Sequence, residues 1–153
     1  MNLVDELFAI ARALDGAGIE YAVCGGIAVG LHGWVRTTKD IDLLIRPEDV
    51  ARVLEAVHPL GFTMPALPMT FGAGTDAERH VQRVTKLDRD PLTLDLLLAD
   101  AAYEGLLEGR IAVTQPEGTI QLVSRDALLK MKRMAGRLQD LADIEHLENG
   151  DEV

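Results

Sequence analysis

Cysteine is almost absent from the chain: among its 153 residues only Cys24 is present, so no disulfide can form within it. A chain without disulfides is typical of a reducing compartment, and we expect a cytoplasmic protein. No apolar run reaches the roughly 18 to 20 residues that would span a bilayer. The first residues are acidic and lack the basic start of a signal peptide. The sequence therefore predicts no membrane association.

Positive charge and aromatic side chains are also scarce. The chain has 15 lysines and arginines against 25 aspartates and glutamates, which gives a formal net charge of −10. So acidic a protein repels phosphates and is poorly suited to general binding of nucleic acid. Residues 125–137 gather cations, however, and leave room for a local basic surface.

Hydrophobic residues make up 48% of the chain, which suffices for a core without disulfides or a structural metal. We expect one domain over residues 1–153, with a core at about 5–123 and a C-terminal helical segment at 124–147. The elements follow as helix, strand, helix, strand, helix, hairpin and further helices. This order predicts an α/β (α+β) fold, with a small mixed sheet and flanking helices.

Hydrophobic periodicity and turn residues divide the chain into elements. Helices are expected at 2–18, 26–33, 46–62, 100–109 and 124–147, and strands at 20–26, 38–45, 80–87, 92–99, 110–113 and 119–123. The stretch 63–78 is rich in proline, glycine and threonine and is interpreted as a loop. Ser124 is placed as the N-cap of the last segment, and Gly136 is expected to interrupt or kink it.

Two aspartates stand in the strand expected at 38–45. Because side chains alternate along a strand, Asp40 and Asp42 share one face, while Ile41 and Leu43 share the other, core face. Two carboxylates so close repel each other. A fold tolerates them on a solvated face, with a shared proton, or around a bound cation. Mg²⁺ is usually held by one or two carboxylates plus substrate phosphates, so Asp-x-Asp is a suitable clamp.

A third carboxylate, Asp95, lies among leucines in the second strand of the expected hairpin. A lone carboxylate there costs free energy unless it is paired, solvated or bound to a metal. If Asp95 meets Asp40 and Asp42 at one end of the sheet, the three acids make a two-metal site. Solvated strand faces are the alternative for all three.

A glycine pair, Gly25 and Gly26, ends the strand at 20–26 and precedes the short helix that follows. Without Cβ atoms, glycines let backbone N–H groups approach phosphate oxygens closely. The positive end of the helix dipole adds to this attraction for anions. The stretch "GGIAVGL" lacks the lysine of a Walker A loop and the glycine spacing of a dinucleotide-binding loop. Simple turn glycines are the alternative.

Together, "GGIAVGLHGWVRTTKDIDLLI" and the distant Asp95 resemble the DNA polymerase β-like nucleotidyltransferase superfamily. In that superfamily a strand ending in Gly-Gly is followed by Asp-hydrophobic-Asp and by a third aspartate on a later strand. The resemblance implies the nucleotidyltransferase fold.

The sequence is similar, more narrowly, to the AbiEii-type abortive-infection toxin nucleotidyltransferases and their small bacterial relatives. Those proteins carry an arginine and a threonine or serine before the aspartate pair. A late helix adds a lysine, an arginine and two acids. The matching positions here are Arg36, Thr38, Lys132, Arg137, Asp140 and Asp143.

The resemblance implies a Mg²⁺-dependent transfer of a nucleoside monophosphate from an NTP to an acceptor hydroxyl, with release of pyrophosphate. It implies that Asp40, Asp42 and Asp95 hold the metal ions and carry catalysis. The nucleotide-binding residues that it implies are Gly25, Gly26, Arg36, Thr38, Lys132 and Arg137.

Three functions remain open at this stage. The toxin resemblance favours tRNA or a protein as acceptor, with a cognate antitoxin or toxin as a further partner. An enzyme that modifies a small molecule such as an antibiotic is the alternative, and the aromatic content of 4% counts slightly against it. A non-catalytic module that binds a nucleotide or a partner toxin is the third, and the presence of all three aspartates argues against it.

Several of these residues also have a purely structural interpretation. Arg36 suits a surface ion pair, and Thr38 suits a strand. Lys132 and Arg137 stand five positions apart on one expected helix, which does not put them squarely on one face. They could equally pair with nearby acids on a solvated helix. Trp34 is interpreted as a core residue, with stacking on a base as the alternative.

Overall fold

The structure, a computed structural model, describes residues 3–33 and 39–149. The helices are α1 (Leu3–Gly16), α2 (Gly25–Leu31), α3 (Val50–Val57), α4 (Arg125–Ala135) and α5 (Leu138–Asn149). The strands are β1 (Tyr21–Cys24), β2 (Asp40–Ile45), β3 (Phe62–Pro65), β4 (Met69–Phe71), β5 (Arg79–Lys86), β6 (Leu92–Leu98), β7 (Ile111–Gln115) and β8 (Gly118–Leu122). Short 3₁₀ helices lie at Pro47–Asp49, His58–Leu60 and Ala101–Tyr103.

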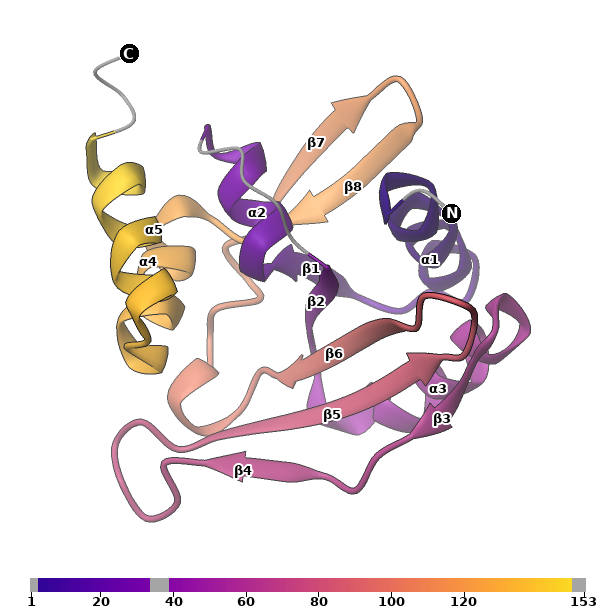
Figure 1. The fold of residues 1–153 in the computed structure, drawn as a ribbon, viewed down its shortest axis with the longest axis horizontal. Helices are drawn as coiled ribbons and strands as arrows, with labels where there is room; N and C mark the ends of the chain where they lie inside the picture. Colours follow the sequence, from indigo (N-terminus) through magenta and orange to yellow (C-terminus); the bar gives the residue numbers. More distant parts are fainter. Residues whose placement is uncertain (1–2, 34–38, 150–153) are drawn as a thin grey trace.

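In the described part of the chain, eight strands form one sheet with the order β3-β5-β6-β2-β1-β8-β7, and β4 pairs with β5 (Figure 1). The pairs β2–β6 and β1–β8 are parallel, and the others are antiparallel. The mixed sheet with flanking helices confirms the predicted α/β class. Strand β2 lies in the middle of the sheet, between β1 and β6.

Strand β2 carries the alternation that the sequence predicted. Ile41, Leu43 and Ile45 are fully buried, whereas Asp40 is exposed and Asp42 is partly buried. Burying each of these aliphatic side chains contributes about 1.5–3 kcal/mol to folding. The apolar face therefore anchors β2 in the core and holds its aspartates on the opposite face.

The helices form two groups around the sheet (Figure 1). Helices α2, α4 and α5 lie together on the left of the view, and α2 contacts both β2 and α4. Helices α1 and α3 contact each other on the right. In α1 the buried positions include Leu7, Ile10 and Leu14, the three- and four-residue spacing of one helix face.

No helix within residues 3–33 and 39–149 is long and apolar enough to cross a membrane.

Two predicted segments differ from the structure. The stretch 63–78 is not wholly a loop, because β3 and β4 pair with the outer edge of β5. Without β3 and β4, the backbone N–H and C=O groups on that edge of β5 would lack partners. Even short, proline-rich segments can form hydrogen bonds with them. The helix predicted at 100–109 is only a 3₁₀ turn followed by further turns. Its Gly105 adopts a positive φ of 84°, which breaks a helix.

The C-terminal helical segment consists of two helices. Ser124 caps α4 as predicted, since its side chain accepts a hydrogen bond from the backbone N–H of Ala127. Gly136 ends α4 in the left-handed conformation, with φ at 61°, and its N–H donates to the carbonyl of Lys132. The chain then turns back, so that α5 packs against α4. Gly136 is thus a complete interruption.

Candidate active site

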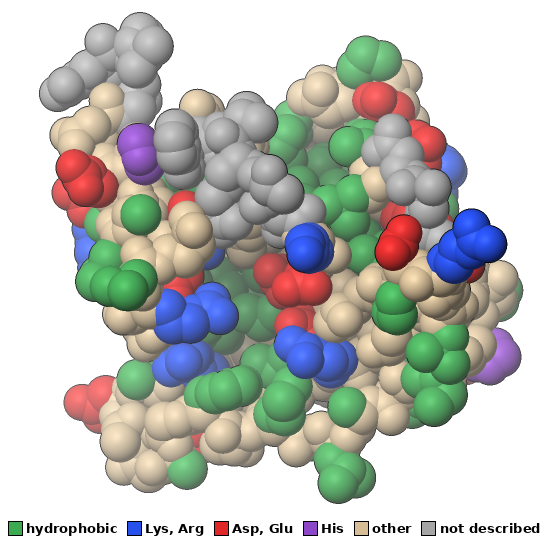
Figure 2. Space-filling model, in the orientation of Figure 1, with side chains coloured by type: hydrophobic (Ala, Val, Ile, Leu, Met, Phe, Trp, Pro, Cys, Tyr) green, Lys and Arg blue, Asp and Glu red, His purple; other side chains and the backbone are tan. Residues whose placement is uncertain are grey.

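The aspartates of β2 lie beside the third predicted aspartate, on the neighbouring strand β6. The parallel register places Asp42 directly opposite Asp95 and Asp40 opposite Thr93. Figure 2 shows acidic side chains in the middle of this side of the molecule, with basic side chains around them. The three aspartates that the sequence predicted to converge therefore come from adjacent positions of two paired strands.

Asp42 is a largely buried acid without a cation of its own. Among the described residues, its carboxylate has neither a hydrogen-bond partner nor an ion-pair partner. Burial, reinforced by the charges of Asp95 and Asp40, raises the pKa of Asp42 to about 7. An uncompensated carboxylate in such a place is costly, and it favours a cation from outside the chain.

Gly25 makes room for the Asp42 carboxylate. Residue 24 is opposite Asp42 in the register of β1 and β2, and α2 begins at Gly25 immediately afterwards. A Cβ atom at Gly25 would collide with the carboxylate of Asp42. Gly26 is buried and does not line the groove described below. The sequence predicted that the glycines admit phosphate; the structure adds that the first of them admits an aspartate.

Arg83 holds Asp95 and was not predicted from the sequence. Arg83 on β5 is directly opposite Asp95 on β6. Its Nε donates to Oδ1 of Asp95 at 2.8 Å, and its Nη2 donates to Oδ2 at 3.1 Å. Such a two-pronged pair is among the stronger side-chain interactions. Only the exact register of the hairpin reveals this pair, and the strands expected at 80–87 and 92–99 imply a register that differs by one residue.

Lys132 and Arg137 converge on the same acid, because the chain turns at Gly136. Lys132 is buried, and its Nζ lies 3.2 Å from Oδ1 of Asp140 and 3.1 Å from Oδ2 of Asp143. Nε of Arg137 donates to Oδ2 of Asp140 at 2.7 Å. The expectation that Lys132 and Arg137 lie on one continuous helix is therefore wrong.

Asp140 and Arg137 each stabilise the charged form of the other. Burial alone would raise the pKa of Asp140, but the hydrogen bond from Arg137 and the charge of Lys132 outweigh it and lower that pKa. The hydrogen bond to Asp140 in turn raises the pKa of Arg137. Arg137 therefore stays charged at neutral pH and can meet an anionic ligand.

A groove with a volume of about 570 Å³ joins these parts. Its charged lining consists of Asp40, Asp42, Asp95, Asp140, Arg79, Arg83, Lys132 and Arg137. Its uncharged lining consists of Gly25, Met69, Phe71, Val81, Leu97, Tyr103, Leu128, Met131 and Ala135. Burial raises the pKa of Tyr103 to about 12, so its phenol is neutral. The groove therefore places acids, cations and an apolar wall within one space, which we call the aspartate groove.

Three predicted residues fall outside this description. Arg36, Thr38 and Trp34 belong to residues 34–38, which lie outside the described residues. Cys24 is fully buried, and burial raises the pKa of its thiol well above the usual value. It is an unreactive core residue.

The carboxylates of the aspartate groove suit a hard divalent cation in their chemistry. Asp42 lacks a partner among the described residues, and Asp40 and Asp95 are its neighbours in the sheet. As their side chains stand, no three His, Cys, Asp or Glu residues in the described ranges form a metal-holding group. Both oxygens of Asp95 are engaged by Arg83 instead. The three carboxylates thus suit a metal in their chemistry, while in this arrangement Asp95 is paired with Arg83.

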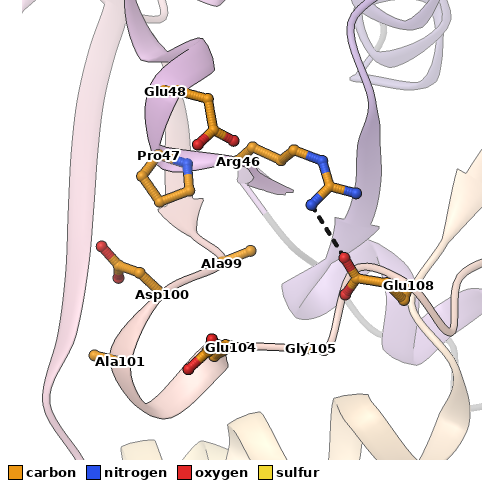
Figure 3. Close-up of a pocket in the computed structure, with 9 residues that line it drawn as sticks. All are labelled: Arg46, Pro47, Glu48, Ala99, Asp100, Ala101, Glu104, Gly105 and Glu108. Carbon is orange, nitrogen blue, oxygen red and sulfur yellow. Dashed lines mark hydrogen bonds and ion pairs between the residues drawn. The ribbon is translucent and has the colours of Figure 1, made fainter.

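A second cavity of similar volume lies at the carboxyl ends of β2 and β6 (Figure 3). Four acids line it, namely Glu48, Asp100, Glu104 and Glu108. Arg46 also lines it and donates hydrogen bonds of 3.0 Å to Glu108 and to Glu20. No residue that the sequence singled out for function lines this cavity.

Comparison with known families gives one match, over residues 6–106, to the family described as aminoglycoside-2''-adenylyltransferase. The matched region spans α1 to the 3₁₀ turn after β6, and so includes all three aspartates. No curated protein sequence matches the chain.

Several solved structures share the fold. The lincosamide antibiotic adenylyltransferase LnuA, with lincomycin bound, has a TM-score of 0.62 and 18% identity, over 94% of this chain and 95% of that one. ANT(2'')-Ia in complex with adenylyl-2''-tobramycin has a TM-score of 0.57 and 15% identity, over 98% and 89%. A Thermotoga maritima structure described as a candidate nucleotidyltransferase has a TM-score of 0.66 and 13% identity, over 96% and 92%. The expected nucleotidyltransferase fold is confirmed.

Proposed function

The chain belongs to the aminoglycoside-2''-adenylyltransferase family, and we propose that it transfers a nucleoside monophosphate from an NTP, ATP in the first place, to a hydroxyl group of a small antibiotic-like molecule. The observation that carries this proposal is the pairing of Asp42 with Asp95 on the floor of a groove that also contains Lys132 and Arg137. Acids for a metal and cations for a triphosphate thus face one space.

In the proposed reaction, the acceptor oxygen bonds to the α-phosphorus as the bond from that phosphorus to the β-phosphate oxygen breaks. Pyrophosphate leaves with the electron pair of the broken bond. The acceptor's proton passes to a carboxylate, which we assign to Asp95 because Leu97, two residues away on the same strand face, lines the apolar part of the groove. Most of the rate enhancement then comes from positioning and charge neutralisation.

Asp40, Asp42 and Asp95 would hold the divalent metal, which we propose to be Mg²⁺. When bound, it would neutralise phosphate charge and strengthen the acceptor oxygen as a nucleophile. Lys132 is fixed by Asp140 and Asp143, so it would meet the triphosphate with little loss of side-chain entropy. The side chain of Arg137 is 76% exposed, so it can turn from Asp140 to a phosphate.

The comparisons favour an antibiotic acceptor over the tRNA or protein of a toxin, which finds no support among them. The wall of the groove adds a reason to prefer a small molecule with an apolar part. Met69, Val81 and Leu97 are opposite one another across β4, β5 and β6 and so form one apolar row. This row, which we call the apolar row, lies beside Asp95, where an acceptor would have to bind.

The charges around the apolar row point to a second candidate acceptor within the same class. Arg79 and Arg83 flank Val81 on the same face of β5. Two arginines repel a polyamine such as tobramycin more than they repel lincomycin, which carries fewer amines. The family name suggests an aminoglycoside, whereas these residues favour an acceptor of the lincosamide kind.

A transfer assay tests the proposal. The purified chain is incubated with Mg²⁺ and α-phosphate-labelled ATP, GTP, CTP or UTP, together with lincomycin, tobramycin or bulk tRNA. We expect label on an antibiotic, and its loss in the Asp42→Asn variant. Asp90→Asn, in the exposed turn of the hairpin, is the matched control and should keep the activity.

Each other outcome points to a different function. Label on tRNA alone would restore the toxin hypothesis. Nucleotide binding without transfer to any acceptor would favour a non-catalytic module. A melting temperature unchanged by ATP and Mg²⁺ would reject the nucleotide site itself.

A further inference from the structure

Arg83 occupies both oxygens of Asp95 from directly across the β5–β6 hairpin. On the other side of Asp95, in the same row of the sheet, stands Asp42, which has no partner among the described residues. The positive charge that neutralises Asp95 thus lies on the side away from Asp42. No cation among the described residues forms an ion pair with Asp42, although the charges of Lys132 and Arg137 act on it.

A divalent cation shared by Asp42 and Asp95 has to compete with this guanidinium. Both carboxylate oxygens already accept a well-aligned hydrogen bond from Arg83, and the charge of the arginine repels a second cation nearby. The side chain of Arg83 is 45% exposed and lines the aspartate groove. It can therefore turn away from Asp95 into the groove without becoming a buried, unpaired charge.

We propose that Arg83 keeps Asp95 from binding a divalent cation until a nucleotide is present, and that its guanidinium then moves from the Asp95 carboxylate to phosphate oxygens. The inference rests on the proposed function, since it takes Asp95 as a metal ligand and the aspartate groove as the nucleotide site. Phosphates accept the same two-pronged hydrogen bonding from arginine as a carboxylate does. Binding of metal and of nucleotide is then coupled through Arg83, and each tightens the other.

Binding of Mn²⁺ to the full chain tests this without turnover, with the free ion counted by electron paramagnetic resonance. Removing the competitor in Arg83→Gln should tighten binding of Mn²⁺ alone by about tenfold. Arg83→Lys should fall between that variant and the wild type, because an ammonium cannot hold both oxygens in the same way. Arg79→Gln is the matched control: it removes a charge four residues away on the same face of β5, from a guanidinium that lies over Phe71. It should change the affinity by no more than about twofold.

The coupling is measured with α,β-methylene-ATP, whose bridge cannot be cleaved by this reaction. The analogue should tighten Mn²⁺ binding to the wild type more than to Arg83→Gln. Binding of Mn²⁺ to the free analogue is the same in both mixtures and cancels in the comparison.

Two results would overturn different claims. If Arg83→Gln binds Mn²⁺ no more tightly than the wild type, while Asp95→Asn binds it more weakly, Asp95 is a ligand and Arg83 does not compete for it. If Asp95→Asn binds Mn²⁺ as tightly as the wild type even in the presence of α,β-methylene-ATP, Asp95 is not a ligand, and the metal site of the proposed function fails instead.

Discussion

The carboxylate of Asp42 fills the space that a side chain at residue 25 would need. Gly25 begins α2 with φ at +68°, and a Cβ atom there would collide with the carboxylate. Asp42 is also opposite Cys24, the residue just before this glycine. The glycine motif and the aspartate motif, which are separate in the sequence, therefore form one steric unit at the end of β1.

Replacement of Gly25 by alanine should damage both folding and the site. A left-handed φ costs a non-glycine residue roughly 1–2 kcal/mol, and the new methyl group must also displace the Asp42 carboxylate. Gly18→Ala is a matched control, since Gly18 has φ at +69° with open space around it. Urea denaturation should show a clearly larger loss of unfolding free energy for Gly25→Ala, together with weaker Mn²⁺ binding. Equal losses in the two variants would mean that the contact with Asp42 carries no weight.

The free energy of unfolding should depend on pH because the carboxylate of Asp42 has no ion-pair partner among the described residues. In the folded protein without metal its pKa is about 7, above the ordinary aspartate value of 3.8. The folded state thus holds a proton that the unfolded state releases, so stability falls as pH rises from about 4 to about 7. At most this loss is on the order of 4 kcal/mol.

Asp42→Asn cannot ionise and should escape this loss. In EDTA-containing buffer, its unfolding free energy should equal or exceed that of the wild type, by a margin that grows from pH 4 to pH 7 and then levels off. Addition of Mg²⁺ together with α,β-methylene-ATP at pH 8 should stabilise the wild type more than the variant. A margin that does not vary with pH would show that Asp42 has another partner in solution.

Sequence reasoning reached the parts of the site that depend on local pattern. Alternation along one strand was enough to put Asp40 and Asp42 on the face opposite the core, and Ser124 followed from the preference of serine for N-caps. The nearness of Asp95 to Asp42 was a condition of the two-metal hypothesis and an implication of the family resemblance, and the parallel register of β2 and β6 establishes it. The roles of these aspartates in metal binding and catalysis stay predictions.

Arg83 could not be predicted, because its position depends on one residue in the hairpin loop. The sequence suggested a turn at 88–91, which would pair residue 87 with residue 92. The structure instead leaves Leu87 in the loop and pairs Lys86 with Leu92. A shift of one residue turns every side chain to the opposite face, and only the observed register puts Arg83 opposite Asp95.

Lys132 and Arg137 both pair with Asp140, and helical periodicity does not predict this. Five positions on one helix separate two side chains by about 1.4 turns, but Gly136 ends α4 between them. The turn brings Asp140 of α5, which also pairs with nearby Arg137, back to Lys132 on α4. A glycine within an amphipathic segment can kink a helix or end it, and the packing of α5 against α4 decides which.

The proposal that the acceptor binds against the apolar row can be tested by placing a charge in that row. Met69→Glu places a carboxylate in the apolar row, two strands away from Asp95. We expect KM for lincomycin to rise about tenfold through loss of apolar contact, and KM for tobramycin to fall. Thr70→Glu is the matched control, because the neighbouring residue of β4 points to the other face. Parallel changes in both variants would place the acceptor elsewhere.

Variants of Lys132 and Arg137 should distinguish a contribution to folding stability from a contribution to nucleotide binding. Lys132→Met leaves Asp140 and Asp143 buried with one cation fewer, and breaking such a pair costs about 3–5 kcal/mol. The side chain of Arg137 is 76% exposed, so Arg137→Met should lower the free energy of unfolding by no more than about 1 kcal/mol.

If both cations bind the triphosphate, Arg137→Met should raise the dissociation constant for ATP about tenfold at nearly unchanged melting temperature. Arg133→Met, which removes an exposed arginine paired with Glu148, supplies the baseline for ATP binding. Should Arg137→Met bind ATP as well as Arg133→Met does, Arg137 serves only to fix Asp140 beside Lys132.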